Sequence, residues 1–579
     1  MSAVLQAREP NSRYLATAES ALLRGFELLT SAPGGVAKLR ALILEFAVQG
    51  RLVRQDGSDE PASLLVQRAQ AERGLPAGRR LTRTLGTSDA SEAPLPGGWC
   101  WSSLGEVGLI SPRNEATDDT AATFVQMSSV PVAMMERHKA EDRLWRDIKS
   151  GFTHFADGDV GLAKITPCFE NGKSTVFRDL ANGIGAGTTE LHVVRPLGGL
   201  LPEYILIFLK SPGFLRNGEA VMTGSAGQKR VPRAYFESTP LPVPPLAEQH
   251  RIVARVEELM KLCDALEQSG RLVDEQHARL TSTLFDALAT SESAQALAEN
   301  WQRVAEQFDL LLDRPEAVDA FEQIITQLAV RGLLVPQDNR ADSGRNLLVR
   351  FLQAGSESGK RAKAELAPLG ADDTPFSTPE LWAWARLGDV VDITGGVTLG
   401  RKGALANPLS LPYLRVANVQ RGHLNLATEV KTVSIDAAEL PRFQLKAGDL
   451  LITEGGDWDK VGRTCIWRNE IPTCLHQNHI FRVRGRTAEW SPEWGQLYLN
   501  SADARAYFAS SAKQTTNLAP INMTQLRHCA LPLPPLAEQH RIVARVEELR
   551  RLCADLRERL TQGQEVQSSL ADALVAKVA

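Results

Sequence analysis

The sequence lacks the features of a secreted or membrane-spanning protein. It has seven cysteines among 579 residues and no C-x-x-C pair, which suits reduced thiols in a cytoplasm and not a disulfide framework. No stretch approaches the roughly 18 apolar residues that a membrane span requires. The first residues also lack the basic-then-apolar pattern of a secretory signal. We therefore expect a cytoplasmic protein with no membrane partner.

Motifs of nucleotide-driven and methyl-transfer catalysis are also missing. There is no G-x-x-x-x-G-K-[ST] sequence that would cradle phosphates. There is no Asn/Asp-Pro-Pro-aromatic tetrapeptide of the kind that amino-methyltransferases use, because both Pro-Pro pairs follow Val or Leu. Gly183–Gly187 is rich in glycine but does not match G-x-G-x-x-G, so we interpret it as a flexible turn. We expect no catalytic and no cofactor-binding residue in this chain.

What the sequence does contain is a long internal repeat. The sixteen residues Pro244–Leu259 recur unchanged as Pro534–Leu549. Two weaker echoes occur in the same order: AVQGRLV and AVRGLLV at Ala47–Val53 and Ala329–Val335, and WCWSSLGEV and WAWARLGDV at Trp99–Val107 and Trp382–Val390. The chain is therefore two tandem halves, and each half is too long to be a solenoid repeat.

The segments between the echoes differ, so we interpret the shared segments as a frame and the divergent segments as two versions of one module with different specificities. Simple duplication followed by drift is the alternative, but drift does not explain sixteen unchanged residues. The predicted parts are a helical region and linker (1–98), a first variable domain (99–240), a central helical spacer (241–381), a second variable domain (382–530) and a C-terminal helical spacer (531–579).

The shared segments have the pattern of long helices. Apolar residues of the first copy recur with a 4-3-4-3 spacing, at Ile252, Val256, Leu259, Cys263 and Leu266. This heptad seam resumes through Val273, Leu280, Leu284 and Ala287. A helix over residues 246–287 would be about 60 Å long at 1.5 Å per residue. Such a narrow stripe needs partner helices, for which residues 37–48 and 318–329 are candidates. We predict two antiparallel helical rods that hold the variable domains a fixed distance apart; ordinary helical core packing is the alternative.

The variable domains have a mixed α/β pattern with polar loops. Short β-rich runs, among them Leu191–Val194 and Ile480–Val483, alternate with Gly, Asn and Asp turns. Both domains carry Gly-Asp before an apolar run, and both carry loops rich in Gln, Asn, Thr, Lys and Arg, side chains that contact phosphates and base edges. A net charge of only −4 argues against a strong electrostatic binder acting alone, so partners would supply further cationic surface.

These residues resemble the specificity subunit of type I restriction–modification systems. The resemblance covers nearly the whole chain and is carried by the duplicated LP-x-PPLAEQHRIVARVEEL, by GDVGLAKITPCFENGK, TEGGDWDKVGR and QNHIFRVR, and by QTTNLAPINM. It implies an α+β fold in which two α/β target-recognition domains are separated by long antiparallel coiled-coil rods with a pseudo-two-fold repeat. Residues 1–98 are longer than a minimal member needs, and the roles of 1–36 and 74–96 are not indicated.

The resemblance also implies a function. Each variable domain would read one half of a split target in double-stranded DNA, and the helices would seat two methyltransferase subunits, to which restriction/translocase subunits add. Those partners would use S-adenosylmethionine, ATP and Mg, whereas this chain would catalyse nothing and hold no cofactor. The rival interpretations are a coiled-coil scaffold without sequence-specific DNA binding and a free-standing DNA nuclease.

The candidate DNA contacts are polar residues of the divergent loops. In the first variable domain they are Lys164, Asn171, Lys173, Gln228, Lys229, Arg230 and Arg233; in the second they are Glu454, Lys460, Arg463, Gln477, Asn478, Lys513, Gln514 and Asn517. We expect Glu454 to accept from a cytosine amine and the Gln and Asn side chains to pair with adenine. For any single residue the alternative is a solvated loop position.

Two patterns point only weakly to metal chemistry. Cys465, Cys474, His476 and His479 gather in one stretch, but without the spacing of a standard zinc site. We favour structural thiols and DNA-facing histidines there. Glu429–Lys431 has half of a nuclease carboxylate–lysine pattern with no carboxylate close upstream. We expect no metal site.

Overall fold

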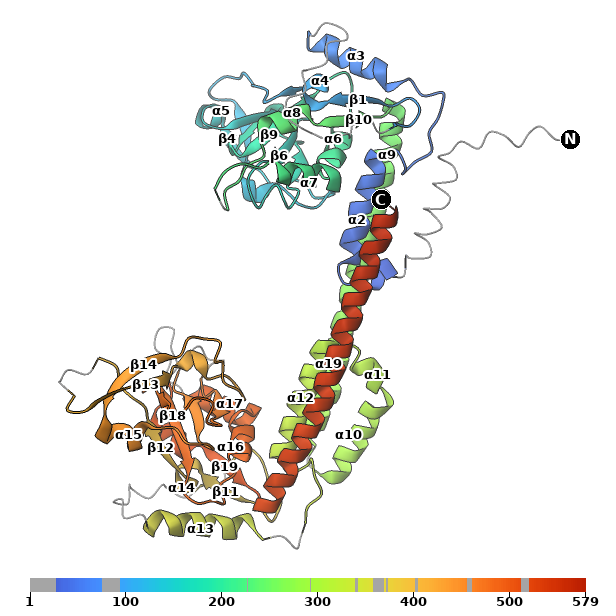
Figure 1. Ribbon diagram of the computed structural model, residues 1–579. Coiled ribbons are helices and arrows are strands. Elements are labelled where there is room, and N and C mark those ends of the chain that lie inside the picture. Colours follow the sequence, from blue (N-terminus) through green and yellow to red (C-terminus); the bar gives the residue numbers. More distant parts are fainter. Residues whose placement is uncertain are drawn as a thin grey trace, which may run out of the picture. The chain divides into compact units, whose positions relative to one another are not determined.

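The computed structural model of the protein has two compact units. The first unit comprises Met1–Asp274 and Gly563–Ala579, and the second comprises Glu275–Gln562 (Figure 1). The structure describes residues 26, 28–74, 94–225, 227–291, 293–338, 342–357, 369–370, 373–400, 405–455, 461–511 and 520–578. Within these ranges, no helix has both the length and the hydropathy that crossing a membrane demands.

The repeated segments form the predicted helices. The two long helices are α9 (Leu246–Ala289) and α19 (Leu536–Val578), and the shorter candidates are α2 (Gly35–Val48) and α12 (Pro315–Val330). The heptad seam is confirmed at its start, where Ile252 and Val256 are fully buried. Each shorter helix ends before a glycine in the left-handed conformation, Gly50 with φ +69° and Gly332 with φ +74°.

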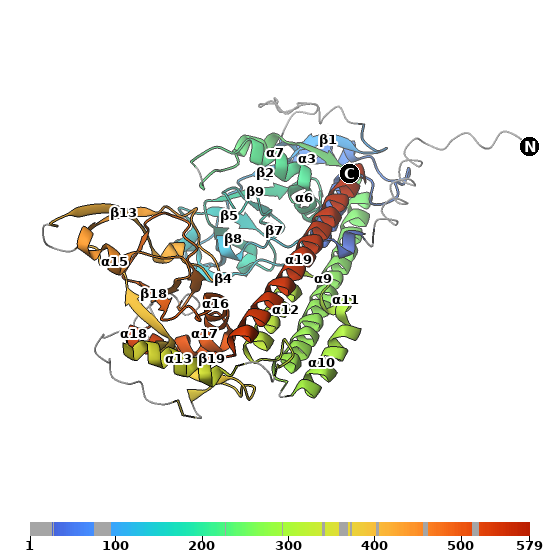
Figure 2. The same ribbon diagram turned by 60° about the horizontal axis from the view of Figure 1, so that its bottom comes forward.

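Both units contain the same three-helix arrangement. In the first, Arg40 of α2 pairs with Asp264 in the first half of α9, and Lys38 pairs with Asp572 near the end of α19. In the second, Arg557 of α19 pairs with Asp319 and Glu322 of α12, and Figure 2 shows these two helices side by side. In the first unit the short helix α2 thus lies beside the first half of α9 and the end of α19. In the second unit α12 lies beside the end of α9 and the first part of α19. This is the predicted antiparallel, pseudo-two-fold repeat, whereas the fixed separation of the domains stays a prediction.

The seam does not continue as predicted. Val273 and Leu280 are 57% and 42% exposed, so the predicted seam is wrong at these two residues, whereas Leu284 packs against the core. In the second unit α9 turns a different face inward, because it packs on α12 through Phe285, whose ring lies 5.5 Å from that of Phe321. The same core receives residues of α10 (Ala294–Glu306), α11 (Phe308–Leu311) and α13 (Gly344–Glu357), which lie in the predicted helical spacer but were not predicted as separate helices.

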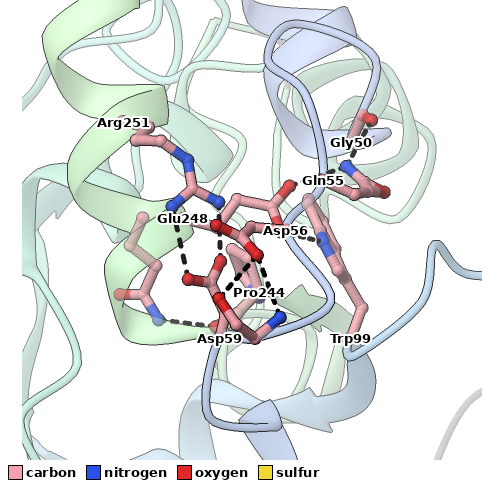
Figure 3. Close-up of polar contacts among 10 residues, drawn as sticks. Gly50, Gln55, Asp56, Asp59, Trp99, Pro244, Glu248 and Arg251 are labelled. Carbon is pink, nitrogen blue, oxygen red and sulfur yellow. Dashed lines mark hydrogen bonds and ion pairs between the residues drawn. The ribbon is translucent and has the colours of Figure 1, made fainter.

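A polar cluster fixes the start of each long helix. Figure 3 shows Trp99 and Gln55 directed at Glu248, a carboxylate in the first turn of α9. The Trp99 indole donates to Glu248 over 3.0 Å, and the Gln55 amide donates to it over 2.7 Å and to the Gly50 carbonyl over 3.1 Å. Burial raises the pKa of the Glu248 carboxyl, so the cluster helps to satisfy a group that has lost its water.

The second unit repeats this cluster. Trp382 donates to Glu538 over 3.1 Å, and Gln337 donates to Glu538 over 2.7 Å and to Gly332 over 3.1 Å. The repeated W-x-W sequence is thereby explained, because its first tryptophan anchors the duplicated helix. Both tryptophans are buried, as expected of core residues.

Alanine at Gly50, the glycine that follows α2, is expected to destabilise the protein. A Cβ at Gly50 would lie 2.5 Å from Pro96 and 2.9 Å from Trp99, and the backbone there is left-handed. Gly50→Ala should therefore lower the free energy of unfolding by about 2–4 kcal/mol, through strain and overpacking together. Gly34→Ala is the matched control, because Gly34 has φ +70° and nothing within 4 Å of the added Cβ. Urea unfolding followed by tryptophan fluorescence measures both; equal losses would exclude the clash.

The first variable domain contains two small sheets and an antiparallel strand pair. β1 (Cys100–Ser103) pairs with β10 (Pro240–Val243), so the two ends of the domain lie together. One sheet has the order β2-β9-β6-β7 and the other β4-β3-β8-β5. Their bounds are β2 Gly108–Ile110, β9 Leu191–Pro196, β6 Val160–Ala163, β7 Ser174–Val176, β4 Glu141–Leu144, β3 Ala121–Val125, β8 Ile184–Gly187 and β5 Thr153–Ala156. Helices α4 (Leu104–Val107), α5 (Trp145–Ile148), α6 (Pro202–Leu209), α7 (Pro212–Ala220) and α8 (Arg233–Ser238) complete the domain, and α3 (Ala62–Glu72) packs against it.

The glycine-rich segment is a strand and not the flexible turn we expected. Ile184–Gly187 forms β8, between β3 and β5. A Cβ at Gly185 would lie 2.5 Å from both the Phe155 ring and the Thr123 carbonyl. Glycine is thus required there for close packing.

The second variable domain repeats the strand order of the first, except that its smaller sheet has no counterpart of β5 among the described residues. Its strand pair is β11 (Ala383–Arg386) with β19 (Ala530–Leu533), and its sheets are β12-β18-β15-β16 and β14-β13-β17. The bounds are β12 Val391–Gly395, β18 Ile480–Gly485, β15 Leu450–Thr453, β16 Thr464–Ile466, β14 Lys431–Asp436, β13 Pro408–Leu414 and β17 Leu475–His476, with helices α14 Leu387–Val390, α15 Leu440–Phe443, α16 Pro492–Leu499, α17 Ala502–Ser511 and α18 Met523–His528. The predicted β-rich runs are confirmed as parts of β9 and β18. The two divergent segments are therefore two versions of one fold.

Candidate nucleic-acid interface

Two loops of the first variable domain meet beside the end of β6. The Thr166 amide donates to the Lys229 carbonyl over 3.0 Å, and the Val231 amide donates to the Lys164 carbonyl over 2.8 Å. Candidate residues that are more than sixty positions apart in the sequence are thereby brought together. Lys164, Lys229 and Arg230 lie on these two paired segments.

An ion pair organises this junction. The Arg230 guanidinium donates to both carboxylate oxygens of Glu190, each over 2.8 Å. The Arg230 hydrogen bond is the main cause that lowers the pKa of Glu190. The two side chains are 43% and 25% exposed, so the pair lies at the surface, within reach of a ligand. Glu190, just before β9, was not among the sequence-predicted residues, and no pattern in the sequence distinguishes it.

The other candidates of this domain divide into two groups. Asn171, Gln228 and Lys229 have exposed side chains. Lys173 and Arg233 have partners inside the protein: the Lys173 amine donates to the Met127 carbonyl over 3.2 Å, and Arg233 pairs with Glu237 over 3.3 Å. The first group is available to a ligand without any rearrangement.

The second variable domain presents an imidazole–carboxylate pair at its strand ends. Glu454 follows β15 and His479 precedes β18, and the Glu454 amide donates to the His479 carbonyl over 3.0 Å. The His479 ring contacts the Glu454 carboxylate through Nδ1 over 2.6 Å. His479 is 55% exposed and Glu454 28%, so the ring is the outer member of the pair.

The remaining candidates of this domain lie around that pair. Arg463 donates to the Gln420 side chain over 2.8 Å. The backbone amides of Gln477 and Asn478 donate to Leu414 and Val397, and both side chains are half-buried. The predicted contacts Lys460, Lys513, Gln514 and Asn517 lie outside the described residues.

The cysteines and one histidine of the second domain belong to its core. Burial raises the pKa values of Cys465 and Cys474 to about 12 and lowers that of His476 to about 4. His476 is fully buried and contacts the Ile480 carbonyl over 2.9 Å. The expectation of a DNA-facing His476 is therefore wrong, because the residue lies in β17 inside the domain. No group of three or more His, Cys, Asp or Glu side chains suited to a metal ion occurs among the described residues.

The two domains share two backbone hydrogen bonds at the ends of β6 and β15. Lys164 in the first domain donates to the Glu190 carbonyl over 2.9 Å, as Glu454 does to His479. The Val231–Lys164 bond of 2.8 Å corresponds to a bond of 2.8 Å from Ile521 to Glu454. By the register of the strands, Lys164 is therefore equivalent to Glu454, and Glu190 to His479. One backbone frame carries unlike polar side chains.

Comparison with known proteins places the chain in a family. A family model described as "Type I restriction modification DNA specificity domain" matches residues 186–273 and 379–564. The chain is 38% identical to the EcoEI and EcoAI type I restriction enzyme specificity subunits of Escherichia coli, over 93% of this chain and 93% of each relative. The solved structure of the HsdS subunit from Thermoanaerobacter tengcongensis is 21% identical, with a TM-score of 0.40, and the match covers 84% of this chain and 97% of that one. Specificity subunits are the non-catalytic members of restriction–modification complexes. The chain thus belongs to the family of type I restriction enzyme specificity subunits.

Proposed function

We propose that this chain is the DNA sequence-recognition subunit of a type I restriction–modification complex and that each variable domain reads one half of a bipartite target. The observation that carries the proposal is the shared strand order of two domains whose matched positions hold unlike side chains. Domains with one backbone frame approach duplex DNA in the same way. Their different donors and acceptors would then select different bases.

The chemistry of the candidate residues suits this role. The first domain offers exposed amide, ammonium and guanidinium groups at Gln228, Lys229 and Arg230. Lysine and arginine side chains neutralise phosphates, and arginine and amide groups also read base edges in the major groove. The modest total charge of −4 implies that partner subunits contribute much of the electrostatic affinity.

We further propose two methyltransferase partners, one for each copy of the duplicated segment. The buried residues of that segment are explained by packing, but its exposed residues are also identical in both copies. These residues form a docking stripe on one face of each long helix: Ala247, His250, Ala254, Arg255, Glu258 and Leu262 in the first copy, and Ala537, His540, Ala544, Arg545, Glu548 and Leu552 in the second. The stripes end on leucines that are 54% and 59% exposed. An exposed apolar group repeated in this way favours a partner that binds twice.

A charge at the end of one stripe should remove one partner. Leu262→Asp or Leu552→Asp should each reduce the complex from two methyltransferase copies to one, and the double variant should leave none, because a carboxylate would be buried at the interface. Native mass spectrometry of the co-purified complex counts the copies. Leu272→Asp is the control, because Leu272 is 55% exposed but lies outside the stripe. One partner copy, or three, in the wild-type complex would contradict the proposal.

Restriction/translocase subunits are the further proposed partners. S-adenosylmethionine, ATP and Mg would be used by the partner subunits. This chain's part would be to bind the target and to present the docking stripes.

Selection from a randomised duplex library tests the proposed function. The chain co-purified with its methyltransferase subunits should enrich one motif made of two short specific halves and an unread gap. A scaffold without sequence recognition would enrich no motif. A free-standing nuclease would instead cleave the library in the presence of Mg without any partner.

A further inference from the structure

The two variable domains differ in chemistry at one matched pair of strand ends. In the first domain the pair is Lys164 and Glu190, and in the second it is Glu454 and His479. The backbone bond that joins each pair has nearly the same length, 2.9 and 3.0 Å. The backbone therefore places the two positions alike in both domains. The carboxylate, however, precedes β9 in the first domain and follows β15 in the second.

In the second domain this exchange places an oriented imidazole at the surface. An ionised carboxylate can only accept hydrogen bonds, so the 2.6 Å contact puts a proton on the Nδ1 atom of His479. Nε2 is then the ring nitrogen that remains for a ligand. In a neutral ring Nε2 accepts a hydrogen bond, and the amines of adenine and cytosine are the donors that the major groove offers.

In the first domain the same place holds a guanidinium. Arg230 binds Glu190 through Nε and Nη2 and binds the Gln228 carbonyl through Nη1. Arginine has five N–H groups, so two remain for a ligand, and guanine O6 and N7 are the acceptors that arginine reads most often. The second domain has Pro520 at the position equivalent to Arg230, and a proline side chain carries no hydrogen-bond donor.

Resting on the proposed function, we infer that this matched site determines the specificity of each domain. His479 is the base-reading residue of the second domain, where it accepts from an adenine or cytosine amine. Glu454 is a positioning residue that fixes the ring, and not itself the base contact that the sequence suggested. Arg230, fixed by Glu190, is the corresponding reader of a guanine in the first domain.

Selection from the randomised duplex library with variants of the intact complex tests this inference. His479→Ala and Glu454→Leu should both abolish the preference at one and the same base pair of one half-site. The expected loss is about 5- to 150-fold in discrimination, the range for one good base contact. The rest of that half-site, the other half-site and the gap should not change.

Two further variants separate orientation from structure. Glu454→Gln keeps an oxygen that accepts from Nδ1 and should preserve the preference, which a role in charge or folding alone does not predict. Arg230→Ala should remove the preference at one base pair of the opposite half-site. His528→Ala is the control, because His528 is a histidine of the same domain whose ring contacts the Thr524 carbonyl of its own helix; its motif should match the wild type.

The outcomes are distinct. If His479→Ala weakens binding to every sequence equally, or if Glu454→Leu keeps the full preference, the inference is overturned while the proposed function stands. If the wild-type complex enriches no bipartite motif, the proposed function and the inference both fail.

Discussion

Exchanging the second variable domain, residues 382–530, for that of another specificity subunit is expected to change one half of the DNA target and nothing else. The physical reason is the strand pair at the domain's ends. Ala383 lies opposite Leu533 in the antiparallel pair of β11 and β19. The chain therefore enters and leaves this domain at a single place beside the helical segments. The complex should then lose about 10³-fold or more in affinity for the original site, because half of its specific contacts are gone.

The same selection experiment measures this result, and the reciprocal exchange is its control. Exchanging residues 99–240 should alter the other half-site, because β1 and β10 close that domain in the same way. Both hybrids should keep the length of the unread gap. A hybrid that altered both half-sites would show that the two domains do not act as separate modules.

Removing the buried carboxylate that precedes β6 or β15 should cause the largest loss of stability. Asp159 is fully buried and accepts from Arg195 over 2.8 and 2.9 Å and from the Ala156 amide over 2.7 Å. Asp159→Ala would remove the charge partner of Arg195, whose side chain is 30% exposed, and would leave the space of a fully buried carboxylate empty. The free energy of unfolding should fall by about 3–5 kcal/mol, as measured by urea unfolding.

The second domain repeats this arrangement and provides a replicate. Asp449 accepts from Arg484 over 2.6 and 2.7 Å and from the Lys446 amide over 2.7 Å, so Asp449→Ala should cost a similar amount. Asp119→Ala is the matched control, since Asp119 is 84% exposed and pairs with Arg146 at the surface. That change should cost less than about 1 kcal/mol. Equal losses at all three sites would refute the ion-pair account.

The helical frame was predictable because its signal is local and duplicated. The heptad spacing around Ile252 predicted the long helix, and the seam is buried where α2 covers it. The repeated Gly-Asp also had a physical meaning, since its aspartate closes a turn and binds an arginine one strand away. What the repeat did not reveal was the change of packing face near Val273, because that depends on α12, which is distant in the sequence.

The candidate site was predictable only in part. Sequence reasoning found the polar loops, and the structure brings Lys164, Lys229 and Arg230 together. It missed Glu190 because a single carboxylate before a strand has no distinctive pattern. It placed His476 and His479 together, although the alternation of β17 and the following turn buries the first and exposes the second. Register between strands, and not composition, decides such assignments.

Mapping methylated adenines in cells that express the chain with its methyltransferase subunits tests directly whether each variable domain reads one half of the target. If each domain does so, the map should show one motif with two unlike specific halves, a gap of constant length, and modification in each half. Methylation confined to a single contiguous motif, or scattered without any motif, would contradict the account of two domains that each read one half.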